Sequence, residues 1–345
     1  MPDTGRPAAA PAQAPTARIV HKPHKFGTRQ KSEIPWLWSD IRTSIRFALL
    51  LLPVWLTSDR FWTRAWRLKS RIRLRTGRGM QRKISIIQEA LGLPDRQAAE
   101  TIARDLRAAT NELKTQALKS WRPLGGWRPK IALEGEAHLR DALSQGKGAV
   151  LWIAPFVFYS GPTKIALHRE GYTVSHLSSP LHGFSGSRYG IRYLNPIQCR
   201  PEDRLIKERI VFDRNAPSAA MRRMVRALKA GEVVSIAASS AEGLEAVEAR
   251  FFDGIMPVAV GAPRLSGLTG APLLPIFTVR EADGTIRVAI DAPIALDPQQ
   301  TSDERCIVAA TAFFHRLEPW VRKYPAQWRG WSKWRPKPGA ISRGR

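Results

Sequence analysis

The sequence predicts an α/β fold in which a mixed central sheet is flanked by helices and preceded by an N-terminal interfacial helical segment. From about residue 149 onward, short apolar runs of strand length alternate with amphipathic stretches of helix length, as in α/β layer structures. Two late apolar runs are separated by Asp283-Gly284, a dipeptide typical of hairpin turns. The predicted sheet therefore contains antiparallel as well as parallel neighbours.

The N-terminal region differs from this alternating pattern. Residues 1–33 are rich in Ala, Pro and cations and have no apolar core of a signal peptide, so they predict a disordered tail. Residues 34–84 contain an apolar run at 47–56, too short for a hydrocarbon core that needs about 20 residues. We expect residues 34–84 to be a membrane-interface anchor and residues 336–345 to be a basic tail.

Residues 85–335 are predicted to form one α/β domain. The helix that ends before Gly231 should bury Met221, Val225 and Leu228, and the last helix begins with a capping box of Thr301 and Glu304. In chain order, the predicted elements are a helical stretch at 84–120, strands at 149–153 and 172–177 around a helix at 161–169, a helix at 217–229, strands at 233–237, 273–279 and 285–290, and the last helix.

The charge of the chain predicts a polyanionic partner. The formal net charge is +26 and the sequence pI is about 11.1. Tryptophans interleaved with cations are typical of proteins at a bilayer interface, whereas no nucleic-acid-binding motif is present. An anionic lipid surface is therefore favoured over nucleic acid. The predicted anchor residues are Trp36, Trp38, Trp55, Trp62, Trp66, Arg60, Arg64, Arg67 and Arg71.

Several segments together point to a family. They are Met221-Arg-Arg-Met-Val-Arg-Ala-Leu-Lys-Ala-Gly-Glu-Val-Val234, Phe251-Phe-Asp-Gly254, the stretch 261–270, Ala271-Pro-Leu-Leu-Pro275, and Tyr324-Pro-Ala-Gln-Trp-Arg-Gly-Trp331. In this order and spacing, residues 60–335 resemble the bacterial lipid A (lauroyl/myristoyl) acyltransferases of the lysophospholipid acyltransferase superfamily.

The resemblance implies a glycerolipid acyltransferase-like sheet and an enzyme at the cytoplasmic face of the inner membrane. Such an enzyme moves a fatty acyl group from an acyl carrier protein or coenzyme A thioester to a hydroxyl of a lipid or lipid-linked sugar. Anionic membrane lipid and acyl carrier protein are the implied partners, and no bound cofactor is implied. The two cysteines, Cys199 and Cys306, predict neither a disulfide framework nor a zinc site.

The residues expected to carry the chemistry are replaced. In the family, a His-x4-Glu/Asp pair follows the strand that corresponds to residues 149–153, and here the pair aligns with Pro155 and Ser160. Neither can act as a general base near neutral pH. None of the seven histidines has Asp or Glu five positions downstream. Three interpretations stay open: an inactive lipid-binding relative, a relocated base, or a different alignment of this segment.

The segment 175–188 offers a relocated base. It follows the second predicted strand, on the side where open α/β sheets bind ligands. His182 is the candidate base, and Arg188 or Arg192 the candidate ligand for a phosphate or headgroup. The alternative is a solvated polar loop. His176, inside the strand pattern, is expected to be a packed residue.

Two further positions are candidates for substrate binding. Glu242-Gly243 is similar in placement to the acceptor-phosphate site of glycerol-phosphate relatives in the superfamily. Arg209 would contribute a charged wall, or else form an exposed salt bridge. Three functions therefore remain: an acyltransferase, a catalytically inactive lipid-binding relative, and a basic protein that binds nucleic acid.

Overall fold

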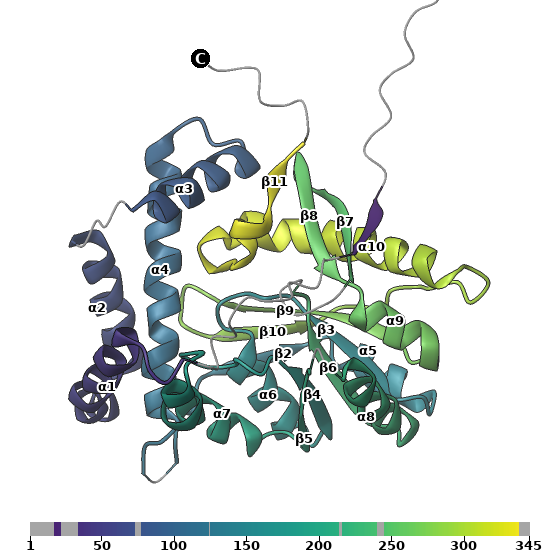
Figure 1. Ribbon diagram of the computed structural model, residues 1–345, viewed down its shortest axis with the longest axis horizontal. Coiled ribbons are helices and arrows are strands. Elements are labelled where there is room, and N and C mark those ends of the chain that lie inside the picture. The colour runs from purple at the N-terminus through teal and green to yellow at the C-terminus, as the bar shows by residue number, and fades with distance from the viewer. Residues whose placement is uncertain are drawn as a thin grey trace, which may run out of the picture.

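The computed structural model describes residues 17–21, 34–72, 77–123, 125–213, 216–239 and 245–337 (Figure 1). The α-helices are α1 (Trp38–Leu56), α2 (Asp59–Ile72), α3 (Arg78–Leu91), α4 (Arg96–Lys119), α5 (Glu136–Ser144), α6 (Ser160–Arg169), α7 (Asn195–Asp203), α8 (Pro217–Lys229), α9 (Gly261–Thr269) and α10 (Ser302–Lys323). The strands are β1 (Arg18–His21), β2 (Ile131–Glu134), β3 (Ala149–Ile153), β4 (Val174–Ser178), β5 (Glu208–Val211), β6 (Val233–Ala237), β7 (Glu245–Phe251), β8 (Gly254–Ala259), β9 (Leu273–Arg280), β10 (Ile286–Ile290) and β11 (Arg335–Pro336).

The predicted mixed sheet is confirmed. Its seven strands lie in the order β2-β10-β9-β3-β6-β4-β5, and β9, β3, β6, β4 and β5 run parallel to one another. The β9–β10 hairpin reverses direction, as predicted from Asp283-Gly284. All five residues of β3 are buried, which is typical of a strand covered on both faces. The carboxyl ends of the parallel strands meet at one edge, and the polar segments follow there.

A second sheet was not predicted. It has four strands in the order β1-β7-β8-β11, with antiparallel pairing throughout. Its edge strand, Arg18–His21, lies inside the segment 1–33 for which we expected disorder. Backbone pairing with β7 positions this short strand, with Ile19 opposite Val247 and Val20 opposite Ala246.

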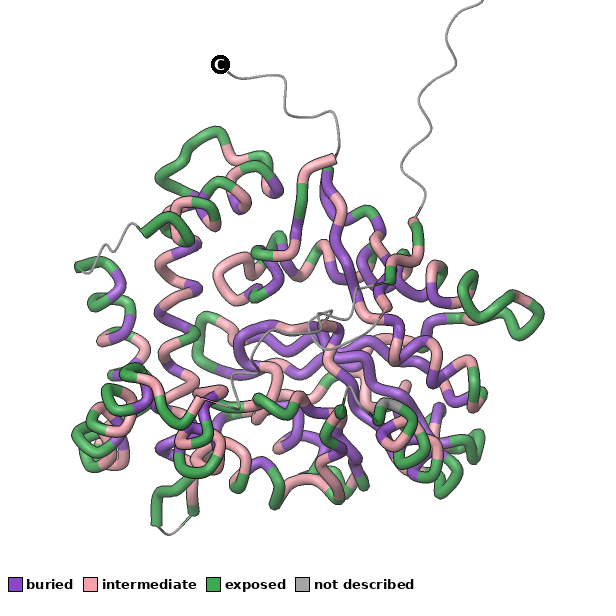
Figure 2. Tube along the Cα trace, viewed as in Figure 1, coloured by how far each residue is buried: buried purple, intermediate pink, exposed green. Residues whose placement is uncertain are grey.

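Helices cover the two faces of the central sheet and form two main apolar clusters. One cluster joins the sheet to α3, α4, α8, α9 and α10, where the Trp152 and Phe313 rings lie 4.4 Å apart. The other packs α5 and α6 against the opposite face. Figure 2 shows that burial is concentrated in the strands, whereas α1 and the outer turns of α8 are largely exposed.

Two helical predictions need correction. The stretch 84–120 is two helices, because Gly92 adopts a left-handed φ of 63° and Asp95 caps the N-terminus of α4 by accepting from Gln97 N. Helix α8 has the predicted bounds, but Met224 is the buried methionine and Met221 is only partly buried. The capping box of α10 is confirmed, with Phe314 and Leu317 buried.

The N-terminal helices place the tryptophans differently from the prediction. Helix α2 packs on α4, and Figure 1 shows α1, α2 and α4 together on one flank of the molecule. Trp62 and Trp66 are buried in this packing, and Trp55 donates from Nε1 to the Leu118 carbonyl at 2.9 Å. These three residues are therefore structural. The C-terminal tryptophans at 328, 331 and 334 are buried as well.

What α1 and α2 expose is aliphatic and aromatic. Along α1 the exposed large side chains recur at helical spacing and form one stripe, which we call the α1 stripe: Trp38, Ile41, Ile45, Leu49, Leu52 and Leu56. Phe61, Leu68 and Ile72 are exposed on α2. Within the described ranges, no helix combines the length and apolar character needed to cross a bilayer.

Candidate active site

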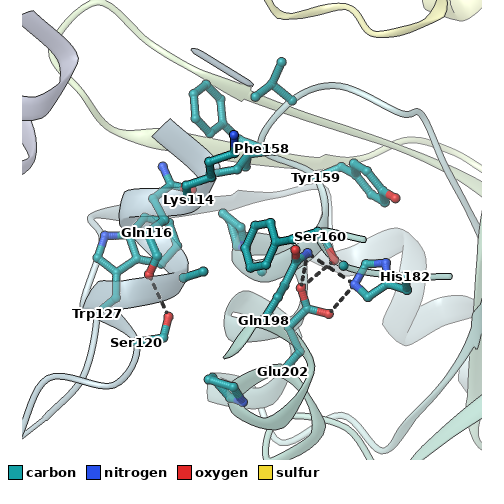
Figure 3. Close-up of a pocket in the computed structure, with 18 of the residues that line it drawn as sticks. Lys114, Gln116, Ser120, Trp127, Phe158, Tyr159, Ser160, His182, Gln198 and Glu202 are labelled. Carbon is teal, nitrogen blue, oxygen red and sulfur yellow. Dashed lines mark hydrogen bonds and ion pairs between the residues drawn. The ribbon is translucent and has the colours of Figure 1, made fainter. Parts of the chain in front are cut away.

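A cavity of about 430 Å³ lies at the carboxyl edge of the central sheet. Its walls come from α4, from the segment that follows β3, from the loop after β4 and from α7, and Figure 3 shows the side chains that line it. The volume is within the usual range of small-molecule sites. The lining is apolar at Leu113, Val157 and Phe158 and polar at Ser160, His182 and Glu202. One wall of the cavity is thus apolar, and the other carries a cluster of ionisable groups.

The segment after β3 is held by the C-terminal part of the chain. Val157 N donates to the Gln327 carbonyl at 2.7 Å, Arg329 N donates to the Pro155 carbonyl at 3.3 Å, and Phe156 forms a bridge with Trp328. Pro155 therefore serves as a backbone acceptor in a fixed turn. Ser160 is the first residue of α6 and aims its hydroxyl at α7.

Glu202 is the centre of the polar cluster. Its side chain is 8% exposed, and its Oε1 accepts from Ser160 Oγ at 3.0 Å and from Gln198 Nε2 at 3.2 Å. Its Oε2 lies 2.6 Å from Lys164 Nζ, 3.1 Å from an Arg209 guanidinium nitrogen and 3.1 Å from His182 Nε2. Four elements, α6, α7, β5 and the loop after β4, therefore converge on one buried carboxylate.

The electrostatics keep this carboxylate ionised. Burial would raise the pKa of Glu202, but Lys164 and the hydrogen bond from His182 overcome burial and hold the pKa well below its usual range. Burial lowers the pKa of Lys164, an effect that the same carboxylate opposes. Arg209 has a raised pKa, because Glu202 and Asp203 outweigh its desolvation. The cluster is thus two cations on one anion, beside an imidazole.

His182 is positioned to work with Glu202. Its side chain is 16% exposed and lines the cavity, and Figure 3 shows His182, Glu202, Gln198 and Ser160 pointing toward one another. When Nε2 carries the proton, it donates to Glu202, and the lone pair of the neutral ring is then on Nδ1. Gln198 Nε2 lies 3.2 Å from the same ring nitrogen. A carboxylate that fixes the imidazole tautomer is the arrangement a general base requires.

His176 is a packed residue, as expected. It is buried, its Nδ1 lies 2.8 Å from Ser235 Oγ, and burial followed by repulsion from Lys164 lowers its pKa well below the usual value. The imidazole is therefore neutral at physiological pH and is tied to the neighbouring strand β6.

The other predicted site residues separate into four groups. Arg209 is neither an exposed salt bridge nor a free wall, because it is largely buried against Glu202 and Asp203. Arg188 and Arg192 are exposed and line a different recess. Glu242 lies outside the described residues. Arg60, Arg64, Arg67 and Arg71 are exposed on α2.

Sequence reasoning missed Glu202, Gln198 and the role of Lys164. Lysines are usually exposed, yet Lys164 is 3% exposed and paired with Glu202. The available signal was the i,i+4 spacing of Gln198 with Glu202 and of Ser160 with Lys164, which places each pair on one helix face. Only the fold shows that these two faces oppose each other.

Comparison with known proteins confirms the resemblance. Residues 191–333 match the family model described as bacterial lipid A biosynthesis acyltransferase. The matched stretch contains Glu202 and Arg209 and begins after Pro155, Ser160 and His182. No curated protein matches the chain.

Proposed function

We propose that the protein is a membrane-surface O-acyltransferase whose general base is His182, and the match of residues 191–333 to the model of bacterial lipid A biosynthesis acyltransferases supports this proposal. The donor is an acyl carrier protein or coenzyme A thioester, and the acceptor is a hydroxyl of a lipid or lipid-linked sugar. The observation that carries this proposal is the contact of 3.1 Å between His182 Nε2 and Glu202 Oε2 at the wall of the cavity.

The reaction requires two proton transfers, one from the acceptor hydroxyl to His182 and one from His182 to the leaving thiolate. His182 Nδ1 accepts the proton of the acceptor hydroxyl while the hydroxyl oxygen attacks the carbonyl carbon of the thioester. The C–S bond breaks as the tetrahedral intermediate collapses, and the leaving thiolate takes the proton from the imidazolium. The ester and the free carrier thiol are the products.

Two neighbouring features support this assignment. Glu202 stays ionised and can stabilise the imidazolium that forms, because Lys164 and His182 lower its pKa. The first-turn N–H groups of α6, whose first residues Ser160 and Gly161 line the cavity, are candidate donors to the oxyanion. In the family the acid stands where this chain has Ser160, and the Glu202 carboxylate is 3.0 Å from that hydroxyl. A distant glutamate would thus supply the missing acid.

The membrane part of the proposal is supported by the α1 stripe and the charges around it. Trp38 is 71% exposed, Leu49 is 71% exposed and Leu56 is 82% exposed, so the stripe is uncovered along the whole helix. Burial, together with repulsion from Arg46 of α1 and Lys69 of α2, lowers the pKa of Lys114 on α4. A bilayer with anionic headgroups covers the stripe and relieves this repulsion. Docking would occur at the cytoplasmic face of the inner membrane.

Thiol release tests the chemistry. Purified protein, an acyl thioester and a lipid acceptor extract should release carrier thiol and form a lipid ester. We expect His182→Gln to lower the rate by about 100-fold or more, the usual contribution of a general base. The exposed His168→Gln is the matched control. An unchanged rate in His182→Gln would remove His182 from the mechanism.

One observation favours a second candidate, a catalytically inactive lipid-binding relative. Pro155 carries no ionisable group, and every oxygen of Glu202 is already engaged by the cluster. The double change Pro155→His with Ser160→Glu distinguishes the two, because it restores a histidine and a carboxylate at the positions that align with the family pair. If wild type transfers no acyl group and this double variant does, the natural chain is the inactive relative.

Vesicle co-sedimentation tests the membrane arm separately. Replacing Leu49 and Leu52 by Asp should abolish binding to vesicles that contain anionic lipid. Each change removes apolar area that the bilayer would bury, and each adds a negative charge that the anionic lipid repels. Since both side chains are exposed, the fold should be unaffected. Binding that survives this double change would exclude the α1 stripe as the docking face.

A further inference from the structure

A second recess lies between the start of α1 and the segment that follows the His182 loop. Its volume is about 450 Å³, and it is open to solvent. Its walls include Trp36, Ile41, Arg188, Tyr189, Arg192 and Tyr193, and we call it the arginine recess.

The two walls of the arginine recess are fastened together. Arg188 N donates to the Ile34 carbonyl and Tyr189 N to the Pro35 carbonyl, both at 2.9 Å. Beneath them the buried Asp40 accepts from Ser187 Oγ at 2.5 Å. The shape of the recess is therefore set before any ligand arrives, which reduces the entropic cost of binding.

The recess carries two uncompensated positive charges. Arg188 and Arg192 are both exposed and lie one helical turn apart, and in the described part of the chain no carboxylate forms an ion pair with either. This contrasts with Arg209, which is fully committed to carboxylates nearby. An arginine guanidinium can donate two parallel hydrogen bonds to phosphate oxygens. A phosphate is therefore the ligand that would pair with these two side chains.

The aromatic residues place the recess at an interface. Trp36 is 47% exposed and Tyr193 is 55% exposed, and the Arg192 guanidinium lies 5.5 Å from the Tyr193 ring. Aromatic rings beside arginine are favoured at headgroup depth. Ile41 belongs both to the recess and to the α1 stripe. A lipid whose acyl chains contact the stripe would therefore bring its headgroup to the recess.

We propose that the arginine recess binds the phosphate of an anionic lipid headgroup in the bilayer, with Arg188 and Arg192 as its ligands. This inference rests on the proposed function, because it gives the membrane-docked enzyme a phosphorylated lipid as its bound partner. The chain from His182 to Arg188 is one continuous loop, so a phosphate held in the recess lies next to the segment that carries the base. The recess thus positions lipid relative to the cavity without taking part in acyl transfer.

The test compares two pairs of arginines in the full chain. Arg188→Gln with Arg192→Gln removes the proposed ligands, and Arg200→Gln with Arg204→Gln removes two exposed arginines of the same spacing at α7. Binding is measured to phosphatidylcholine vesicles that contain phosphatidic acid, and to vesicles of equal surface charge that contain a fatty acid instead. Thermal unfolding checks that all proteins are folded.

The expected result depends on both the lipid and the pair. On phosphatidic acid, the Arg188/Arg192 variant should bind about tenfold or more weakly, and more weakly than the Arg200/Arg204 variant, since charge-assisted bonds to phosphate exceed general attraction to a charged surface. On fatty-acid vesicles the two variants should lose similar amounts. Equal losses on phosphatidic acid, or equal losses of the Arg188/Arg192 variant on both vesicles, would overturn the recess as a phosphate site.

Acyl transfer is also measured on the same proteins with a detergent-dispersed acceptor. This measurement tests the acyltransferase activity separately from the phosphate site in the arginine recess. Selective loss of phosphatidic acid binding with no transfer by wild type supports the recess and refutes the enzyme. Transfer by wild type with no selective loss of binding refutes the recess and leaves the enzyme intact.

Discussion

Removing either partner of the Lys164–Glu202 pair should be strongly destabilising, and the two losses should not add. The side chains are 4% and 8% exposed and their charged atoms are 2.6 Å apart. Glu202→Gln leaves Lys164 as a buried cation without a carboxylate, a change that typically costs about 3–5 kcal/mol. Lys164→Met leaves Glu202 with Arg209 and His182, so its cost should lie near the lower end of that range.

The double variant removes both charges and should be less destabilised than the sum of the single changes by about 2 kcal/mol or more. Urea unfolding of the four proteins at neutral pH gives this coupling energy directly. A matched cycle on the solvent-accessible Arg140–Glu136 pair, whose side chains are 69% and 30% exposed and whose charged atoms are 3.4 Å apart, should give only about 0.3–0.5 kcal/mol. A coupling below that of the control pair would refute the view that Glu202 is a buried anion held by its cations.

Two other predictions concern stability. The pKa of His176 in the folded protein is well below 6.5. When the pH falls below about 6.5, the unfolded chain therefore binds one proton at this residue that the folded protein does not bind. The free energy of unfolding should decrease by up to about 1.4 kcal/mol for each further pH unit. His176→Gln should remove that slope in urea titrations between neutral and acidic pH, and the exposed His168→Gln should keep it; equal slopes would contradict a buried neutral imidazole. Gly148 has φ +66°, and a Cβ there would lie 2.5 Å from the Glu232 carbonyl oxygen, so Gly148→Ala should cost about 1–3 kcal/mol more than Gly146→Ala, which has φ +71° but open space. Thermal unfolding that ranks the two variants equally would exclude the close approach.

The sequence predicted those parts of the fold that local chemistry determines. The β3 strand, the bounds of α8 and the capping box at Thr301 follow from composition over a few neighbouring residues. The strand Arg18–His21 did not, because a four-residue edge strand is specified by its partner β7 more than by its own residues. Trp62 and Trp66 were misplaced for a similar reason. An amphipathic helix shows which residues share a face, and packing on α4 decides which face is buried.

The candidate site was predictable in part. His182 follows a strand end, and that rule located it correctly beside the cavity. Glu202 lies on α7, and its contacts with His182, Lys164 and Arg209 join side chains from α7, the loop after β4, α6 and β5. The i,i+4 spacings in α6 and α7 show which residues share a helix face, but no pattern in the sequence shows that these two faces meet. The two cations that fix the charge of Glu202 are equally non-local.

The hydrogen bonds between the C-terminal stretch and the segment after β3 determine when during synthesis this segment can reach its folded conformation. Gln327 supplies both a main-chain acceptor to Val157 and a side-chain amide that bonds the backbone N and O of Arg280, each at 2.8 Å. During translation, the turn at Pro155 leaves the ribosome long before these clasping residues exist. The segment after β3 would therefore be held in its observed conformation only once residue 329 has emerged.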